Sequence, residues 1–335
     1  MSRPQARVGT PPLSDSRVVH TRFDPIRVQA LANVALRARE LRLVLHALHT
    51  AGLVPVLLKG AAFLAARAYP DSTPRPMGDL DLWLLPDHID TALDVLQRLG
   101  YRPLHKPLRP LPLRRAYEQQ IELSAAWPGG SVVDLHYWPF QGMWARLVAR
   151  IPQRDLWQRR RVYMWDGQPY ALLAPEDHLL HLLYHSVVNH QLAFPGHRAA
   201  ADVAVSVRVW PVDWHEVIAR ARAWHIATVI WLGLVFVRQQ FPHIVPQDVL
   251  CCLGPSVPRR RLLHKFVPAP GVALPARGRH RYLLYLALCD NPRAWPRLML
   301  WALWPERAWL QARYGETSPR TRLGHIARVF TQPRF

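Results

Sequence analysis

Asp79 and Asp81 are separated by a single leucine in the segment Gly78–Trp83. Side chains two residues apart on a strand point to the same face of a sheet, so the two carboxylates are expected to lie side by side. Neighbouring carboxylates repel each other unless a cation lies between them, and Mg²⁺ prefers oxygen ligands. The spacing therefore predicts a site for Mg²⁺, or for Mn²⁺, with both aspartates as metal ligands.

A third carboxylate, that of Asp134, interrupts the apolar run Val132–Leu135. We expect a strand here, and a third carboxylate on a neighbouring strand would complete a two-metal site for in-line nucleotidyl transfer. His136 alternates with Asp134 and therefore shares its strand face. Two roles stay open for His136, namely a hydrogen bond to a metal-binding carboxylate and direct catalysis.

A predicted strand that ends in Lys59-Gly60 precedes the aspartates. The apolar segment 54–58 is expected to be a strand, Lys59-Gly60 ends it, and a helix is predicted over 61–69. A glycine at this point lets backbone N–H groups approach a phosphate, and the helix directs its positive end there. Lys59 adds a charge, and Arg75 can reach phosphate oxygens across the next loop. Lys59, Gly60 and Arg75 are therefore predicted to hold a nucleoside triphosphate.

The elements that must position these residues change character at about residue 173. Before it, a helix that begins at Asp24-Pro25 and two hairpin signals, at 128–130 and 166–167, predict a mixed sheet with helices. After it, a Pro- and Arg-rich loop is expected over 254–277, and the apolar spacing otherwise predicts helices. These helices are expected over 177–190, 198–209, 213–223, 225–240, 279–289 and 294–313.

The expected fold class is therefore α+β. A nucleotidyltransferase-like sheet domain is predicted over 24–173 and an all-α domain over 174–313, between a loose tail at 1–23 and a basic tail at 314–335. His178, His181 and His185 recur at helical spacing in the second domain and share one helix face. Three interpretations of this face stay open: half of a metal site, packing between helices, and a position facing the sheet domain across a cleft.

The basic excess of the chain lies near its C-terminus. Lys and Arg number 43 against 23 Asp and Glu, a formal charge of +20, and 15 basic but only three acidic residues fall in 256–335. Such a run can bind RNA, DNA or an anionic surface, although its interleaved tryptophans also fit ordinary helix packing. Three cysteines and no apolar signal segment indicate a cytoplasmic protein, and the longest apolar run, 226–237, is too short to span a bilayer.

The order of these motifs resembles that of the DNA polymerase β-like nucleotidyltransferase superfamily. In detail, the chain is similar to the uncharacterised bacterial nucleotidyltransferase family, which has a strand ending in Lys-Gly, an arginine before Asp-x-Asp, and a later strand with an acid before Leu-His. The matching segments are Leu57–Gly60, Arg75, Asp79–Asp81 and Asp134–Trp138, and the similarity continues through Leu173–His185, Asp202 and Asp213-Trp214. The resemblance implies a nucleotidyltransferase fold and an NTP as substrate.

The expected activity is transfer of a nucleoside monophosphate from an NTP to an unknown acceptor, which is a small molecule, a protein or an RNA. Asp79, Asp81 and Asp134 would be the catalytic metal ligands, and Asp134 would help to deprotonate the acceptor hydroxyl. Two alternatives stay open: a degenerate fold that binds or regulates without turnover, and a nucleic-acid-binding protein that uses its basic C-terminus. Asp81 is expected at the cleft surface, so Asp81→Ala is expected to leave the melting temperature unchanged or raise it.

Overall fold

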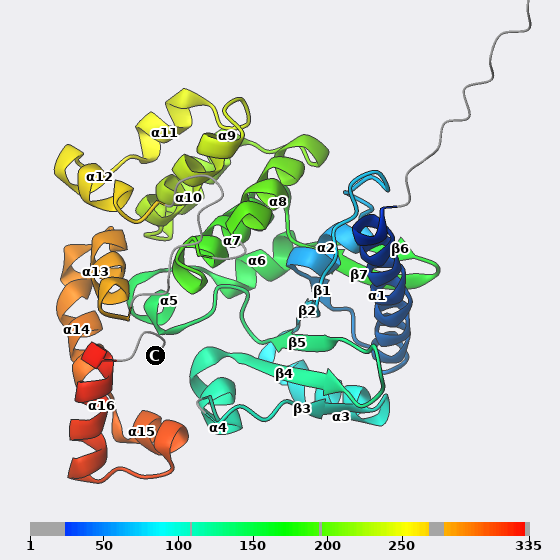
Figure 1. Cartoon of the computed structure of the whole chain (residues 1–335), viewed down its shortest axis with the longest axis horizontal. Coiled ribbons are helices and arrows are strands. Elements are labelled where there is room, and N and C mark those ends of the chain that lie inside the picture. The colour runs from blue at the N-terminus through cyan, green and yellow to red at the C-terminus, as the bar shows by residue number, and fades with distance from the viewer. Residues whose placement is uncertain (1–23, 108, 194–195, 268–277, 332–335) are drawn as a thin grey trace, which may run out of the picture.

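A computed structural model of the chain describes residues 24–107, 109–193, 196–267 and 278–331. Its centre is a seven-stranded mixed sheet of order β3-β4-β5-β2-β1-β7-β6 (Figure 1). The strands are β1 (Val56–Leu57), β2 (Asp79–Trp83), β3 (Tyr101–Pro103), β4 (Gln120–Ala125), β5 (Val132–His136), β6 (Arg161–Trp165) and β7 (Gln168–Leu172). The sheet with helices, followed by helices alone, confirms the α+β prediction. The predicted tail at 1–23 lies outside the described residues.

Both predicted hairpins are present. β4 pairs with β5 and β6 pairs with β7, each in antiparallel register. The β6–β7 turn is Asp166-Gly167, with φ of 49° and 76°, the left-handed values that a tight two-residue hairpin turn requires. Parallel pairs join β2 to β5 and β1 to β7, so the sheet is mixed and its central strands come from distant parts of the chain.

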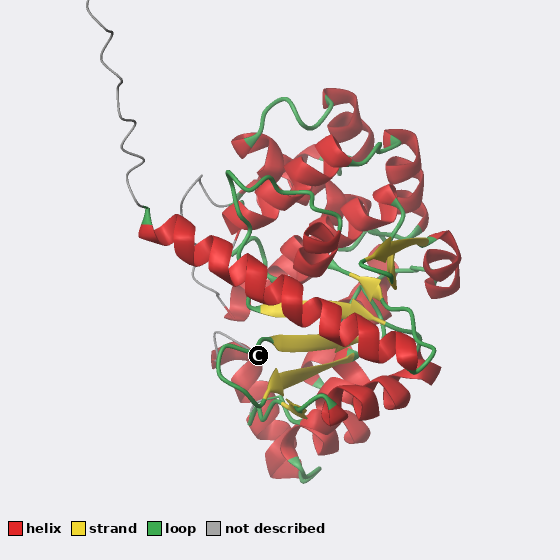
Figure 2. Cartoon of the chain, turned by 90° about the vertical axis from the view of Figure 1, so that its right-hand side faces the viewer, coloured by secondary structure: helices red, strands yellow, loops and turns green. Residues whose placement is uncertain are grey.

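Strand β1 is buried on both faces of the sheet. Leu57 belongs to a hydrophobic core with the helices α1 (Pro25–Thr50) and α3 (Ile89–Arg98), and α1 crosses that face in Figure 2. Val56 belongs to a second core that extends into the C-terminal helices. A strand covered on both faces is continuously apolar, which is why 54–58 shows no alternation. The face toward the C-terminal helices is also the face on which Asp81 lies.

The other helices of the sheet region, residues 24–172, are short: α2 (Lys59–Ala65), α4 (Leu111–Leu113), α5 (Met143–Val148) and α6 (Gln153–Arg159). Helix α2 begins two residues earlier and ends four residues earlier than the predicted helix over 61–69. The helical region, residues 175–331, begins with α7 (Pro175–Tyr184) and a π-helical segment η3 (His185–Asn189). It continues with α8 (Gly196–Val209), α9 (Trp214–Ala223), α10 (Ala227–Gln240) and α11 (Gln247–Leu253).

The C-terminal part corrects three predictions. The segment 254–277, predicted as a loop, contains α12 (Val257–His264), because its proline lies in the first turn, where a helix tolerates it. The helix predicted over 294–313 is two helices, α14 (Trp295–Leu303) and α15 (Arg307–Tyr314), since Pro305 interrupts it. Helix α13 (Gly278–Leu288) matches its prediction.

The third correction concerns 314–335, predicted as a basic tail, which contains α16 (Pro319–Thr331). The hydroxyl of Ser318 accepts a hydrogen bond from the Thr321 N–H at 3.1 Å, so the Ser-Pro pair is a helix start that the arginine content hid. His325 is buried, and the Arg322 guanidinium lies 4.3 Å from the centre of the Trp304 ring. These contacts are those of helix packing. Within the described ranges, no helix has both the length and the apolar character needed to cross a membrane.

Candidate functional site

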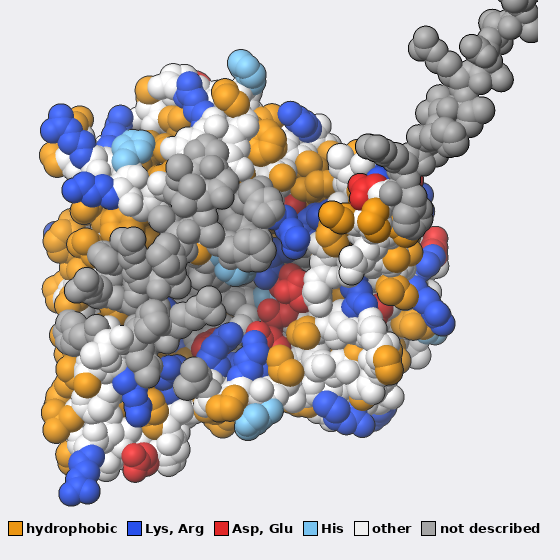
Figure 3. All heavy atoms as spheres, viewed as in Figure 1, with side chains coloured by type: hydrophobic (Ala, Val, Ile, Leu, Met, Phe, Trp, Pro, Cys, Tyr) orange, Lys and Arg blue, Asp and Glu red, His pale blue; other side chains and the backbone are white. Residues whose placement is uncertain are grey.

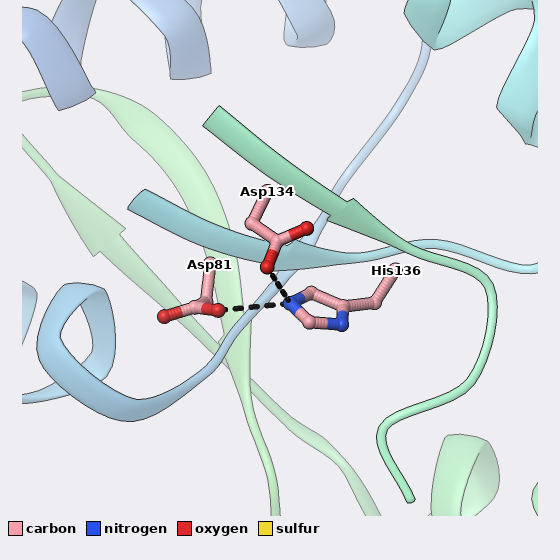
Figure 4. A group of neighbouring side chains, drawn as sticks. All are labelled: Asp81, Asp134 and His136. Atoms are coloured by element: carbon pink, nitrogen blue, oxygen red, sulfur yellow. Dashed lines mark hydrogen bonds and ion pairs between the residues drawn. The ribbon is translucent and has the colours of Figure 1, made fainter. Parts of the chain in front are cut away.

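Asp81 and Asp134 are direct neighbours on the parallel strands β2 and β5. Both side chains point to the face covered by the helical region, and both are buried. Together with His136 they form a group whose ligand atoms all lie within 4.8 Å of one another (Figure 4). The sheet register thus brings together two of the three predicted carboxylates.

His136 is fixed between these carboxylates. Its Nε2 lies 2.8 Å from Asp81 Oδ1 and 3.5 Å from Asp134 Oδ2. The Gln141 amide nitrogen donates to His136 Nδ1, which leaves the proton on Nε2, and the Tyr184 hydroxyl donates to the Gln141 carbonyl at 2.7 Å. The structure therefore gives His136 the hydrogen-bonding role, the first of the two that the sequence left open.

One oxygen of this group is orphaned. Asp134 Oδ1 is buried, and the described residues offer it no hydrogen-bond partner. Burying a carboxylate oxygen without a partner costs free energy, so such an atom in a native site calls for a ligand from outside the chain.

Lys59 supplies the cation next to Asp81. Its Nζ lies 2.5 Å from Asp81 Oδ1. The Leu58 N–H donates to the Asp81 carbonyl at 3.0 Å, and this bond fixes the end of β1 beside β2. Lys59 itself has a φ of 45°, a left-handed value that is unfavourable for a side chain of this size and that turns the chain into α2. The fold therefore holds a strained lysine directly over the acids.

The charges of the group shift one another's pKa values. Burial alone would raise the pKa of Asp81, but the positive charge of Lys59 and the hydrogen bond from His136 outweigh it and lower this pKa. Burial raises the pKa of Asp134, although His136 and Lys59 oppose it. Burial favours the neutral amine of Lys59, yet the carboxylates of Asp81, Asp134 and Asp79 raise its pKa. At neutral pH the group therefore contains an ionised Asp81 and a charged Lys59.

Asp79 lies two residues before Asp81 on the same strand face, at the exposed start of β2. It is not part of the close group of ligand atoms. The negative charge of Asp81 and then burial raise the pKa of Asp79 to about 6. The repulsion predicted between the two aspartates therefore raises the pKa of Asp79 and not that of Asp81.

The expected position of Asp81 at the cleft surface is wrong. The Asp81 side chain is 2 % exposed, lies inside the protein, and is bonded to Lys59 and His136. Its removal would leave the charge of Lys59 without its nearest partner, which destabilises a folded protein. Loss of stability, and not a gain, is the expected result.

Arg75 is directed away from the acids and toward the helical region. Its Nε and Nη2 donate to the two carboxylate oxygens of Asp202 on α8, both at 2.6 Å. The Tyr69 hydroxyl donates to the same carboxylate at 2.6 Å. The contact of Arg75 with a triphosphate stays a prediction, because two of its three nitrogens are already used.

Gly60 makes room for this arginine. A Cβ built on Gly60 would lie 2.5 Å from Arg75 Nη1 and 3.2 Å from the sulfur of Met77. The sequence predicted a close approach of a phosphate to this glycine. The structure instead supplies a close approach of the Arg75 side chain, and the phosphate contact stays a prediction.

The three histidines of the helical region have different surroundings. The buried His178 packs edge-on against Phe63 and Trp210, and His181 packs against Phe140. His185 instead bonds to His190, with 2.8 Å between their Nε2 atoms. His178 and His181 therefore pack against aromatic rings of the sheet region, as expected for a face directed toward that region. Burial, and after it the charge of Lys59, lowers the pKa of His185.

Sequence reasoning missed several polar partners. Gln141 carries no motif of its own, and only its hydrogen bond to His136 singles it out. Asp202 belongs to the family resemblance, but its bond to Arg75 was not predicted. Glu122 is the neighbour of Asp134 on β4 and extends the row of acids, with Lys106 2.5 Å away. Counting residues outward from the predicted turn at 128–130 would have paired Glu122 with Asp134.

The face drawn in Figure 3 has a hollow near its centre. Figure 3 shows acidic side chains at the centre of this face, next to histidine and basic side chains.

One known protein family matches most of this chain. The sequence profile of a family described as uncharacterised nucleotidyltransferase matches residues 12–242. A solved structure of an antigenic nucleotidyltransferase-like protein from Paracoccidioides brasiliensis is similar at 17 % identity and a TM-score of 0.36, over 67 % of this chain and 91 % of that one. No curated protein matches the chain. The profile spans the strands β1, β2 and β5 with Lys59, Asp81 and Asp134, and the chain therefore belongs to the uncharacterised nucleotidyltransferase family.

Proposed function

We propose that this protein is a metal-dependent nucleotidyltransferase, in which an acceptor oxygen bonds to the α-phosphorus of an NTP and pyrophosphate leaves. The observation that carries the proposal is the buried Asp81–Asp134 pair, with one oxygen of Asp134 left without a partner among the described residues. Family membership supports the same class of reaction. Which NTP reacts, and with which acceptor, is the question that the experiment below addresses.

The ligand set fits a hard divalent cation. Two buried carboxylates with ligand atoms within 4.8 Å of each other suit Mg²⁺ or Mn²⁺, and the orphaned Asp134 oxygen is a coordination position that no described residue fills. Asp81 and Asp134 would hold the ion, with Asp79 as a further carboxylate at the entrance. When bound, such an ion supplies positive charge to the phosphate oxygens.

The residues of the chain have separate tasks in this proposal. Asp134 takes the proton of the acceptor hydroxyl, a task that suits a carboxylate whose pKa is raised by burial. Lys59 turns its charge from Asp81 to the triphosphate. Gly60 and Arg75 form the adjoining wall, where the bond to Asp202 holds Arg75 in place.

The test is incubation with each labelled NTP, Mg²⁺ or Mn²⁺, and cell extract, followed by identification of the labelled product. Asp134→Asn should lower labelling by about 100-fold or more, because removing a metal ligand should cost at least as much as removing a group that only orients one. Asp94→Asn is the matched control, since Asp94 is an exposed acid on α3 across the sheet. Equal labelling by wild type and Asp134→Asn would contradict the proposal.

One observation favours a second candidate, a binding or regulatory protein without turnover. Lys59 already compensates the charge of Asp81 at 2.5 Å, so part of the site is neutralised without a metal. This candidate predicts NTP binding that needs no divalent ion and no labelled product. The same incubation, with a parallel NTP titration in EDTA, distinguishes the two.

A further inference from the structure

Strand β6 forms one edge of the seven-stranded sheet (Figure 1). Apolar side chains are exposed on both of its faces: the exposed fraction is 57 % for Val162, 38 % for Tyr163 and 64 % for Met164. Among the described elements, only β7 packs extensively against β6. Proteins usually protect an edge strand with a lysine, a proline or a bulge, and the centre of β6 has none of these. Another strand can therefore add to this edge.

The backbone of β6 directs hydrogen-bonding groups to its open side. The Ala171 N–H donates at 2.9 Å to the carbonyl just before β1, so Ala171 directs its backbone toward β1. Successive residues of a strand alternate, and the β7 residues on either side of Ala171 therefore bond to β6, where they oppose Arg161 and Tyr163. Val162 and Met164 then direct their N–H and C=O groups away from β7. No backbone bond to another described element uses these groups.

A second copy of β6 that runs antiparallel fits these groups. In the register centred on Tyr163, Val162 of one copy opposes Met164 of the other, and the two residues can exchange both of their N–H···O=C bonds. The same pair recurs on the other side of the two-fold axis, as in any isologous dimer. All the outward N–H and C=O groups of both residues are then bonded.

The apolar side chains are complementary in the same register. Val162 and Met164 share one face of β6, so those of both copies join into one apolar cluster. On the opposite face the two Tyr163 rings meet at the axis, and each is already stacked on Tyr170 at 5.8 Å between ring centres. Side chains that are exposed in the single chain thus become buried on both faces of the pair.

The charges at the two ends of β6 favour one orientation. Arg160 and Arg161 lie at its start, and the Asp166 side chain, with an exposed fraction of 53 %, lies at its end, where Arg42 contacts one of its two oxygens. An antiparallel copy sets the arginines of one chain beside Asp166 of the other at both ends of the pair. A parallel copy would set arginine beside arginine, and like charges opposite each other destabilise a pair of strands.

We propose that β6 is a homodimerisation strand: two copies of the chain pair antiparallel about Tyr163 and join their sheets into one. The inference goes beyond the proposed function and does not depend on it. Only a short strand takes part, and small interfaces are typical of weak or transient complexes. The dimer should therefore form reversibly as the protein concentration rises.

Oxidative cross-linking tests the register. In a Cys251→Ser/Cys252→Ser background, which removes the exposed thiols, Tyr163→Cys places the two new cysteines about 4.5 Å apart between Cα atoms, within reach of a disulfide. Met164→Cys is the matched control, since this position is more exposed but its two copies lie diagonally, about 7–8 Å apart. With diamide as the oxidant, Tyr163→Cys should give several-fold more disulfide dimer. An equal or larger yield from Met164→Cys would overturn the inference, because random collision favours the more exposed thiol.

Sedimentation equilibrium of the full chain over a concentration series tests the dimer itself. Wild type should shift from monomer to dimer, and Met164→Lys, which puts a charge into the apolar cluster, should dimerise at least about 10-fold more weakly. Val257→Lys replaces an exposed apolar residue on α12 and should dimerise as wild type. At dilutions where wild type is a monomer, all three should melt at the same temperature. A wild type that stays monomeric up to its solubility limit, or undiminished dimerisation of Met164→Lys, would overturn the inference.

Discussion

Two largely buried ion pairs lie on either side of α2, and they differ in how completely their atoms are bonded. At one, Arg75 meets both oxygens of Asp202, and Tyr69 adds a third hydrogen bond. At the other, Lys59 meets one oxygen of Asp81, and the adjacent Asp134 keeps an oxygen without a partner in the described part of the chain. The first pair is complete in itself, whereas the second group has room for one more ligand.

This difference separates two uses of buried charge. A bidentate arginine–carboxylate pair with its hydrogen bonds satisfied fixes two regions relative to each other. A lysine is a point charge on a flexible stem and can be redirected when a stronger ligand arrives. We therefore assign the Arg75–Asp202 pair to architecture and the Lys59 group to chemistry, and the following variants test that division.

The largest effect is expected at the complete pair. Asp202→Ala leaves Arg75 and the Tyr69 hydroxyl buried without their acceptor, so unfolding in urea should show a loss of about 3–5 kcal/mol. The double variant Arg75→Met/Asp202→Leu should regain much of it, because no charge is left uncompensated. A single-variant loss no larger than that of a surface ion pair, below about 1 kcal/mol, would mean that the pair does not join the two regions.

A smaller and reversible effect is expected at the incomplete group. Lys59→Met leaves Asp81 without its cation and should cost about 3 kcal/mol without metal. Mn²⁺ should restore about 2.7 kcal/mol at one hundred times its dissociation constant, because it binds the folded form. Thermal melting with and without Mn²⁺ measures both. At the same Mn²⁺ concentration Arg75→Met should be stabilised less, because it keeps the Lys59 ammonium that competes with the metal for Asp81. Equal stabilisation of the two variants would remove the difference between the two pairs.

The glycine between the pairs should show an intermediate cost. The added methyl group of Gly60→Ala would overlap Arg75 Nη1, which cannot move freely because Asp202 holds it. A loss of about 1–3 kcal/mol is expected, as for other overpacked sites. Gly324→Ala is the control, since a Cβ there meets no atom within 4 Å and should stabilise α16 slightly. Unfolding curves in which both variants gain stability would remove the packing role of Gly60.

The smallest effect concerns Asp79, whose pKa is raised to about 6 from the usual 3.8, first by the charge of Asp81. The folded form then binds a proton more tightly than the unfolded form, so apo stability falls as the pH rises between these values. Asp79→Asn removes the penalty and should raise the apo melting temperature by about 1–2 °C, a small gain because Asp79 is exposed to solvent. The gain should be full above pH 6 and fade below it. Melting of Asp79→Asn and Asp94→Asn from pH 4 to 8 checks this.

The parts that the sequence predicted well follow local rules. Alternation placed Asp79 and Asp81 on one face, and the Asp-Gly and Gly-Gly turns predicted both hairpins. The partners Asp202 and Gln141 could not be found in this way, because long-range side-chain bonds have no periodicity. The contact between His185 and His190 was missed, because a π-helical turn changes the spacing at which helical side chains meet. Pro305 marks a helix break and Ser318-Pro319 marks a helix start. Both signals were overlooked because these segments are rich in arginine and proline.

The two-residue strand β1 sets an order of assembly during synthesis. Val56 pairs with Trp83 on one side and with Ala171 on the other. The first partner follows within 27 residues, but the second is made only after 88 more, which takes about 4–18 seconds at typical translation rates. Until then, the edge of β1 that receives β7 remains open on the nascent chain, a surface that invites pairing with other chains. Ribosome-bound intermediates that end before β7 should therefore be the ones that most need a chaperone.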